Sequence, residues 1–353
     1  MRLLLYSDSH YLDEPAAAPG VEPRLTFLTK TFQWIAKKIM KHSPKAVFNL
    51  GDTNNQQGSV SIQALHTMCT AIHDITHACS VVKALHVALA GNHDQGTLDG
   101  NANILPAFGR MGMCLVERYH LLESMRVVCI AHTSDPEAFK NSVIAARAGG
   151  AKYAMIHQPV NGILWRPGQP DDGGVDIELF KDFDFTFGGH YHHPQYRKRD
   201  RFAIVGSSCY FNFNDHATTR PRGVVLFDTK TGVPEWLPNP HTPIRHTLQV
   251  TKSEAVLDWL TCGIVAEKHY PRLILKVKCE TSKVKRNVEK KLKDYPLAKL
   301  IVRDMSEGTE TAHERDVVLD APESAIRSFV RDAKTELDRS RLVETGLRAV
   351  GNG

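Results

Sequence analysis

The 353-residue chain contains few cysteines and no long apolar run. Its seven cysteines are scattered without a Cys-x-x-Cys pair, so we expect reduced thiols and neither disulfide bonds nor a thiolate zinc site. The apolar run at the amino terminus is too short for a signal peptide, and no later segment is long enough to cross a membrane. These absences predict a soluble cytoplasmic protein with no membrane contact.

Composition sets broad bounds on the fold. With 42% hydrophobic and 24% charged residues, the chain can bury a sizeable core, and its length suggests more than one domain. We find no internal repeat. The net charge of +5 is a mild bias that nucleic-acid binding would exploit, although charge alone does not identify a partner.

Five short polar motifs occur in order, each after a short apolar run. The runs are Leu3–Tyr6, Ala46–Leu50, Val87–Ala90, Tyr153–Ile156 and Phe183–Phe187. The motifs are Asp8-Ser9-His10, Gly51-Asp52, Gly91-Asn92-His93-Asp94, His157-Gln158-Pro159 and Gly189-His190-Tyr191-His192. Apolar runs of this length, bounded by Gly or polar residues, predict buried strands. Each motif should therefore lie past the carboxyl end of a strand, the edge at which open α/β sheets bind ligands.

Together the motifs supply ligands for two metal ions. These ligands are Asp8, His10, Asp52, Asn92, His157, His190 and His192. Side chains two residues apart on extended backbone point the same way, so each Asp-x-His or His-x-His pair can aim two donors at one site. The Asp52 carboxylate can bridge two cations. Two carboxylates against two divalent ions leave a positive site that attracts a phosphate ester, which a metal pair can clamp.

The donor types also indicate the metal and the catalytic acid. Oxygen and nitrogen donors without thiolate suit Mn²⁺, with Mg²⁺ as the alternative. His93 directly follows a ligand and should point towards the leaving group, where it can act as general acid. Asp94 is expected to orient the His93 ring.

The order and wording of the five motifs resemble the calcineurin-like metallophosphoesterases over roughly the first two thirds of the chain. Within that superfamily the chain looks most like the SbcD-type nucleases, DNA-repair and recombination subunits that work with an SMC-like ATPase. The cues are the fourth and fifth motifs and Val205-Gly206-Ser207-Ser208 after them. The resemblance implies a Mn²⁺-dependent exonuclease or endonuclease that forms a homodimer bound to two ATPase subunits of the SbcC type.

The resemblance also assigns ligands to each metal and marks one departure. One metal would take Asp8, His10, Asp52 and His192, and the other would take Asp52, Asn92, His157 and His190. His93 would be the catalytic histidine. The family often has a His three residues after the bridging Asp, where it helps to place the DNA end. This chain has Asn55 there, which bears on the balance of exonuclease and endonuclease activity.

Two other functions remain open at this stage. Protein serine/threonine phosphatases carry an Arg soon after the second motif, and residues 51–57 contain none, so a phosphomonoesterase is disfavoured. A stand-alone small-molecule or cyclic-nucleotide phosphodiesterase would have almost the same motifs. The non-enzyme alternative is a metal-free interaction scaffold.

Between the motifs, the pattern predicts an α/β fold. Apolar spacing predicts crossover helices at Arg24–His42 and Ser59–Ser80, and a third helix at Pro136–Ala148 after the strand Arg126–Ala131. Further strands are expected at 202–206 and 223–228. We expect residues 1–243 to form a four-layer α-β-β-α metallophosphoesterase sandwich.

After residue 243 the pattern changes to a small α+β unit. Strands are predicted at 244–250, 272–279 and 298–303, and helices at 254–262 and 283–293. Residues 244–304 match the position of a DNA-binding capping domain in the SbcD-type family. Residues 305–353 are expected to be a linker and a C-terminal helix.

Two sets of residues are predicted to bind macromolecules. Cations that can neutralise DNA phosphates are Arg197, Lys198, Arg199, Lys283, Lys285, Arg286 and Lys290. One apolar stripe of the C-terminal helix contains Ile326, Phe329, Val330 and Leu337. This stripe either packs on the chain's own capping unit or binds the ATPase partner.

Several residues outside the motifs allow two interpretations. His73 and His77 are one helical turn apart, but they lie in a crossover helix and metal binding there is not expected. His132 follows a strand and is either structural or close to the ligand edge. Arg166 either touches substrate phosphate or faces water, and Trp165 either stacks on a base or covers a local apolar patch.

Overall fold

The computed structural model describes residues 1–15, 22–97, 102–166, 169–211, 221–261 and 272–305. Among these residues no helix is both long and apolar enough to span a membrane. The predicted C-terminal helix, with Ile326, Phe329, Val330 and Leu337, lies outside the described residues.

The first six-stranded sheet holds the first three motifs. Its strands are β1 (Arg2–Tyr6), β2 (Ala46–Asn49), β3 (Leu85–Leu89), β4 (Cys114–Val116), β13 (Gly223–Asp228) and β14 (Val233–Pro238), in the order β14-β13-β1-β2-β3-β4. The strands β1 to β4 are parallel, whereas β13 and β14 are antiparallel additions. Tyr6 pairs with Asn49, so β1 and β2 end level at one edge.

The second sheet, also six-stranded, holds the last two motifs. Its strands are β5 (Tyr119–Leu122), β6 (Val127–Ile130), β7 (Tyr153–Ile156), β10 (Phe185–Gly188), β11 (Gln195–Arg197) and β12 (Phe202–Ile204), in the order β11-β12-β10-β7-β6-β5. The four central strands are parallel, and Ile130, Ile156, Gly188 and Ile204 stand level at their carboxyl ends.

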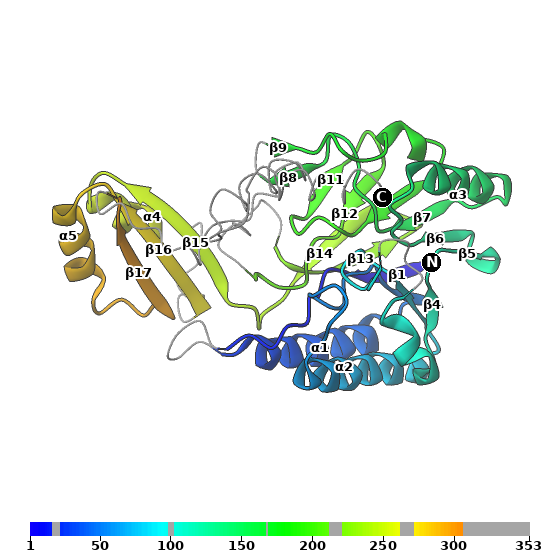
Figure 1. Cartoon of the computed structure of the whole chain (residues 1–353), viewed down its shortest axis with the longest axis horizontal. Coiled ribbons are helices and arrows are strands. Elements are labelled where there is room, and N and C mark those ends of the chain that lie inside the picture. The colour runs from blue at the N-terminus through cyan, green and yellow to red at the C-terminus, as the bar shows by residue number, and fades with distance from the viewer. Residues whose placement is uncertain (16–21, 98–101, 167–168, 212–220, 262–271, 306–353) are drawn as a thin grey trace, which may run out of the picture. The chain divides into compact units, whose positions relative to one another are not determined.

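Three helices cover the outer faces of the two sheets, as Figure 1 shows. The helices α1 (Arg24–His42) and α2 (Ile62–Val81) pack on the first sheet, and α3 (Pro136–Ala148) packs on the second. On β1 the side chains alternate, so that Leu4 packs under the helices while Leu3 packs between the sheets. The predicted α/β fold with two packed sheets between helices is therefore confirmed.

Most predicted elements of the sandwich appear within a few residues of their expected bounds. The helix α2 begins at Ile62 and not at Ser59, because the Ser61 hydroxyl caps it by accepting from the N–H of Ala64. Short elements were not expected from the sequence. They include β8 (Leu164–Arg166), β9 (Gln169–Pro170), η1 (Leu105–Met111), η2 (Glu123–Met125) and η3 (Ile177–Phe180).

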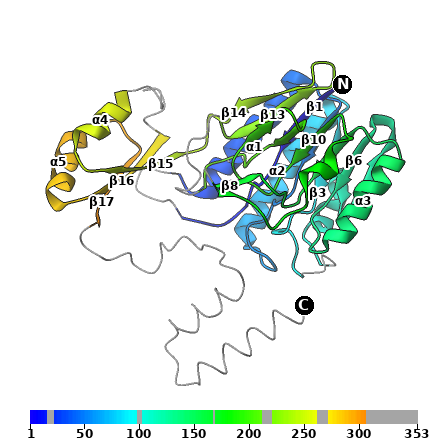
Figure 2. The ribbon, with the colours of Figure 1, turned by 90° about the horizontal axis from the view of Figure 1, so that it is seen from above.

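The region after residue 243 forms a three-stranded parallel sheet covered on one face by helices. Its elements are β15 (Ile244–Val250), α4 (Glu254–Thr261), β16 (Leu273–Cys279), α5 (Ser282–Leu292) and β17 (Lys299–Asp304), with strand order β15-β16-β17. Figure 2 shows α4 and α5 beside this sheet. Leu275 and Val277 of β16 pack with Val288 and Leu292 of α5, so the intervening Lys276 lies on the other face.

Candidate metal centre

The first two motifs are joined by backbone hydrogen bonds at the ligand edge. The N–H of Asp8 donates to the carbonyl oxygen of Gly51 at 3.0 Å. The N–H of His10 donates to the carbonyl oxygen of Asp52 at 2.9 Å. These bonds bring the Asp-x-His pair beside the proposed bridging carboxylate.

Four of the proposed ligands have left-handed backbone conformations. The φ angles of Asp8, His10, Asp52 and His190 are 50°, 44°, 53° and 75°. L-residues rarely adopt this region, and the surrounding structure must hold them there. Asp8 and His10 do converge, but the reason differs from the predicted one, because neither residue is extended. Local strain aims the two side chains at one point.

Two glycines allow the motif loops to approach one another. A Cβ at Gly91 would lie 2.1 Å from Oδ1 of Asp52, and a Cβ at Gly51 would lie 2.5 Å from Nδ1 of His157. No side chain fits at these distances. Gly51 also has a φ of 102°, which favours glycine. These glycines are therefore required by the close packing of ligands rather than by turns alone.

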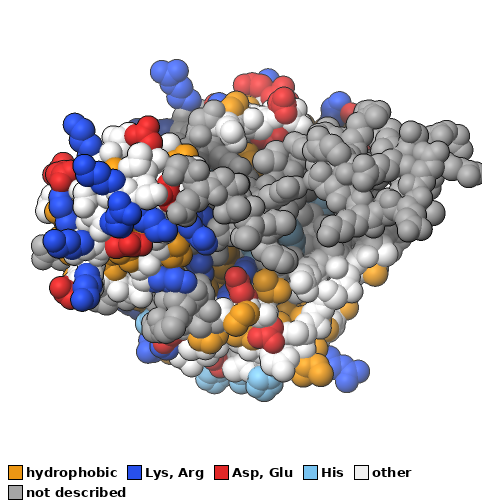
Figure 3. All heavy atoms as spheres, turned by 60° about the vertical axis from the view of Figure 1, so that its left-hand side comes forward, with side chains coloured by type: hydrophobic (Ala, Val, Ile, Leu, Met, Phe, Trp, Pro, Cys, Tyr) orange, Lys and Arg blue, Asp and Glu red, His pale blue; other side chains and the backbone are white. Residues whose placement is uncertain are grey.

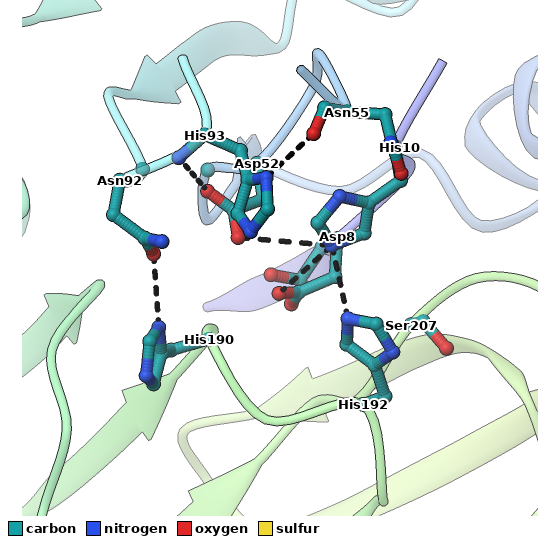
Figure 4. A network of polar contacts seen from close by, with 12 residues as sticks. Asp8, His10, Asp52, Asn55, Asn92, His93, His190, His192 and Ser207 are labelled. Atoms are coloured by element: carbon teal, nitrogen blue, oxygen red, sulfur yellow. Dashed lines mark hydrogen bonds and ion pairs between the residues drawn. The ribbon is translucent and has the colours of Figure 1, made fainter. Parts of the chain in front are cut away.

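The proposed ligands form two groups that meet at Asp52, as Figure 4 shows for most of them. In the first group, donor atoms of Asp8, His10 and His192 lie within 4.8 Å of one another. In the second group, Asp52, His157 and His190 satisfy the same limit. Asp52 Oδ2 lies 3.7 Å from His10 Nε2, and its Oδ1 lies 3.4 Å from His157 Nε2.

Asn92 completes the second group. Its Oδ1 lies 3.1 Å from His157 Nε2 and 3.0 Å from His190 Nδ1. In the first group, Nε2 of His192 and Nε2 of His10 are 2.9 Å apart. Ring nitrogens and amide oxygens that converge in this way are the donor types that divalent transition metals accept.

Buried charge shows that the first group fits a cation. The Asp8 side chain is fully buried, and neither of its oxygens meets the geometry of a hydrogen bond with any described residue, the neighbouring Ser7 hydroxyl included. The contact of its Oδ1 with His10 Nε2, at 4.0 Å, is longer than a hydrogen bond. A buried carboxylate without a hydrogen bond is costly, and a bound cation removes that cost. The Nδ1 atom of His10 is likewise buried without a hydrogen bond among the described residues.

The His157 ring is set up to bind metal through one nitrogen. Its Nδ1 lies 2.6 Å from the carbonyl oxygen of Leu50, which can only accept, so Nδ1 carries a proton. The Nε2 atom then faces Asp52 and Asn92. Ligating histidines commonly donate the second ring N–H to a carbonyl in this way.

Burial and neighbouring charges shift the pKa values of these groups. Burial raises the pKa of Asp8 to about 6. Although burial acts against it, the charge of His157 holds the pKa of Asp52 well below its ordinary value. Burial likewise opposes charge on His157, but Asp52 raises the pKa of His157 to about 9. Burial lowers the pKa of His190 to about 3, so this ring is neutral and can ligate.

Asp94 was expected to orient the His93 ring, but the two side chains are not hydrogen-bonded to each other. The Asp94 carboxylate accepts hydrogen bonds from the backbone N–H groups of Gly91 and Asn54, both at 2.9 Å, and not from the His93 ring. The His93 Nδ1 instead lies 2.6 Å from the backbone carbonyl of Asn55. Because the Asp94 side chain already holds two loop N–H groups, it shapes the motif and the Asn55 carbonyl orients the ring.

His93 also lies near the metal ligands. Its backbone N–H donates to Oδ1 of Asp52 at 2.9 Å, and its ring belongs to a group with His10 and Asp52 whose donor atoms lie within 4.8 Å. Figure 4 shows this ring between Asp52 and Asn55. It is therefore placed to serve either as an acid or as an additional ligand.

Sequence reasoning missed Arg24. This buried side chain donates to Glu14 Oε2 at 3.0 Å and to Asn55 Oδ1 at 3.2 Å. It thus supports the residue whose carbonyl holds His93. The signal was present, because an Arg opens an otherwise amphipathic helix, but its partner Asn55 is 31 positions away.

The weaker candidates are placed as follows. The His132 ring lies over His190 with centroids 6.3 Å apart, and Trp165 lies 5.8 Å from the same ring. Both therefore adjoin the second ligand group. His73 and His77 stack on one another on α2 and belong to no group of three metal-binding side chains in the described part of the chain.

The cations that follow the fifth motif in sequence lie away from the ligands. The turn that contains Lys198 and Arg199 joins the end of β11 to the start of β12, and the start of β12 is the edge opposite the ligands. Arg197 is bound to Asp200 at 2.6 Å and to the carbonyl of Gly162. Their closeness to the fifth motif in sequence therefore does not place this turn at the ligand edge. Their binding to DNA stays a prediction.

Comparison with known proteins places the chain in a family. The family model described as calcineurin-like phosphoesterase matches residues 1–194. The chain belongs to the calcineurin-like phosphoesterase family, which implies a metal-dependent phosphoester hydrolase. A comparison with curated proteins finds no match.

Two solved structures illustrate the likeness. One is a dimetal phosphatase from Danio rerio, with 8% identity, coverage of 64% of this chain and 91% of that chain, and a TM-score of 0.36. The other is Yfce, a phosphoesterase from E. coli, with 12% identity, coverage of 68% and 94%, and a TM-score of 0.33.

Replacing Gly91 by Ala should weaken metal binding. The new Cβ would lie 2.1 Å from Asp52 Oδ1 and 2.3 Å from the Asp52 backbone nitrogen, so the bridging carboxylate and its backbone must shift. We expect Mn²⁺ affinity to fall by about 10–100-fold or more, as when the groups that support a metal are disrupted. Titration calorimetry measures this fall. Gly109→Ala is the control, because its nearest contact would be an ordinary 3.5 Å. Unchanged affinity in Gly91→Ala would contradict the assignment of Asp52.

Metal affinity should rise with pH. The pKa of metal-free His157 is about 9, so below that pH the ring carries an extra proton that it must lose to ligate. The pKa of Asp8 is about 6, so this carboxylate is increasingly protonated below pH 6. We expect the Mn²⁺ dissociation constant to fall about tenfold per pH unit between these values and more steeply below them. Calorimetry in buffers of different ionisation enthalpy measures the released proton. A dissociation constant that is independent of pH would contradict this coupling.

Proposed function

We propose that the protein is a two-metal DNA nuclease of the SbcD type that hydrolyses phosphodiester bonds in DNA repair and recombination. The observation that carries the proposal is the pair of ligand groups on either side of Asp52, whose two oxygens face His10 of one group and His157 of the other, with His93 beside them. Phosphomonoesters and diesters both suit such a site. The choice of a phosphodiester over a phosphomonoester rests on the residues of the five motifs and on the cations of the region after residue 243.

The residues have separate roles in this proposal. Asp8, His10, Asp52 and His192 would hold one divalent ion, and Asp52, Asn92, His157 and His190 would hold the other. Bound Mn²⁺ or Mg²⁺ would polarise the phosphoryl oxygens and activate water. His93 keeps a proton on Nδ1 through the Asn55 carbonyl, so a proton on Nε2 is the one it can give to the leaving oxygen.

The cations that favour DNA over a small diester lie on and around α5. Figure 3 shows Lys and Arg side chains gathered over the unit that contains this helix. Lys283, Arg286 and Lys290 are exposed, while Val288 and Leu292 anchor the helix to its sheet. Exposed cations that neutralise phosphates supply most sequence-independent affinity for DNA.

The proposed assembly follows the same family pattern. A homodimer would bind an SMC-like ATPase of the SbcC type, and the C-terminal stripe with Ile326, Phe329, Val330 and Leu337 would be the contact.

Two other functions compete with the nuclease. One is a stand-alone small-molecule phosphodiesterase, and the other is a metal-free scaffold that is not an enzyme. Incubating the purified protein and Mn²⁺ with linear duplex, single strand and a cyclic dinucleotide separates the three. Cleavage of the cyclic dinucleotide alone would reject the nuclease.

The variant His93→Ala should show whether His93 acts as the general acid or as a metal ligand. If the ring is the general acid, turnover falls by about 10²–10⁴-fold while metal content stays near that of the wild type. Elemental analysis and initial rates on a DNA substrate measure the two quantities. His73→Ala, on the exposed face of α2, is the control. A variant that loses one metal ion would show that His93 is a ligand instead.

Replacing Lys283, Lys285, Arg286 and Lys290 by Ala should weaken DNA binding and flatten its salt dependence. The expected change is up to about 0.9 log units of slope for each duplex phosphate that these cations no longer neutralise. Hydrolysis of bis(p-nitrophenyl) phosphate should be unchanged, because the metal ligands are untouched.

A matched variant controls for the change in net charge in that experiment. It replaces four cations of α1 by Ala, namely Lys30, Lys37, Lys38 and Lys41. If both variants keep the wild-type salt slope, α5 does not bind DNA. If both lose it equally, the effect is one of net charge and not of a site.

A further inference from the structure

We propose that the indole of Trp165 is a stacking platform for the nucleobase next to the scissile phosphate. The proposal rests on the nuclease function above and adds a base-binding position beside the second ligand group. It distinguishes nucleotide substrates from phosphate diesters that lack a planar base.

The indole lies directly beside a proposed metal ligand and remains open to solvent. Its ring centroid is 5.8 Å from that of His190 and 5.9 Å from that of Tyr191. The residue is nevertheless 42% exposed. Trp is enriched at interfaces, where its apolar ring meets a partner while its N–H can reach solvent.

The alternative interpretation was that Trp165 covers a local apolar patch. The indole does contact Tyr191, which belongs to the same apolar cluster as Ile163. It also contacts the proposed ligand His190, and 42% of the residue stays exposed. The indole therefore lies at the border between this cluster and the site. Its remaining surface is available to a ligand.

The backbone that carries the indole is held in place. The side-chain amide of Gln195 binds Leu164 twice, accepting from its N–H at 2.9 Å and donating to its carbonyl at 2.8 Å. Beside the indole, Tyr191 is fixed by hydrogen bonds to Asp171 at 2.7 Å and to Val160. A platform held in this way loses little conformational freedom when a ligand stacks on it.

A base is the group that this surface fits. The indole has no charge to bind phosphate, and its polar N–H lies at the ring edge, so its face suits a planar apolar group. Stacking on an aromatic side chain tolerates every base, as a nuclease without sequence preference requires. The neighbouring His190 places the phosphate side of the same nucleotide at the metal ligands.

The test compares Trp165→Ala, Trp165→Phe and Leu164→Ala on an oligonucleotide and on matched oligonucleotides with one abasic residue on either side of the cleaved bond. Loss of stacking, about 1–3 kcal/mol, corresponds to roughly a 5–150-fold fall in kcat/KM. We expect that fall for wild type on one abasic substrate and for Trp165→Ala on the intact one. Trp165→Ala should no longer discriminate between them.

The other variants and metal content make the result specific. Trp165→Phe should retain most of the base preference. Leu164→Ala should retain all of it, because the Leu164 side chain has no aromatic ring on which a base could stack. If Trp165→Ala keeps the wild-type preference, or loses metal because His190 moves, the platform is rejected. If wild type cleaves no oligonucleotide, the nuclease proposal itself fails.

Discussion

The burial of the Asp8 and Asp52 carboxylates at the meeting point of two sheets is the constraint on which the site depends. Both side chains are almost inaccessible, and the charges must be compensated within the protein or by cations. His157 compensates Asp52 in the metal-free protein, but Asp8 has no comparable partner among the described residues. This imbalance fits the gathering of imidazoles around the two acids.

The sheets and their helices were predictable because each apolar run is short, continuous and followed by a polar motif. Parallel strands end at one edge, so the order of the motifs also predicted that their side chains gather there. The same rule, applied to the strand before His132, would have placed that ring at the site. Applied to the turn after β11, it would have placed Arg197, Lys198 and Arg199 away from it.

Orientation within the site could not be read from the chain. The contact between Arg24 and Asn55 spans 31 positions, and the carbonyl that holds His93 belongs to a backbone group that any residue type supplies. Likewise, adjacency of Asp94 and His93 suggested a hydrogen bond, whereas loop geometry turns the carboxylate towards two N–H groups. Residue types indicated the chemistry, but only folded geometry assigns each hydrogen bond.

The division of the ligands between the two sheets has a mechanical consequence. Asp8, Asp52 and Asn92 follow strands of the first sheet, whereas His157, His190 and His192 follow strands of the second. Each ion would therefore act as a cross-link between layers that are otherwise held at this edge by side-chain packing and hydrogen bonds. The ligands lie almost two hundred positions apart and converge only in the folded chain, so the free energy of metal binding adds to the free energy of unfolding. Metal binding would thus stabilise the packing of the two sheets against each other as well as prepare the site for chemistry.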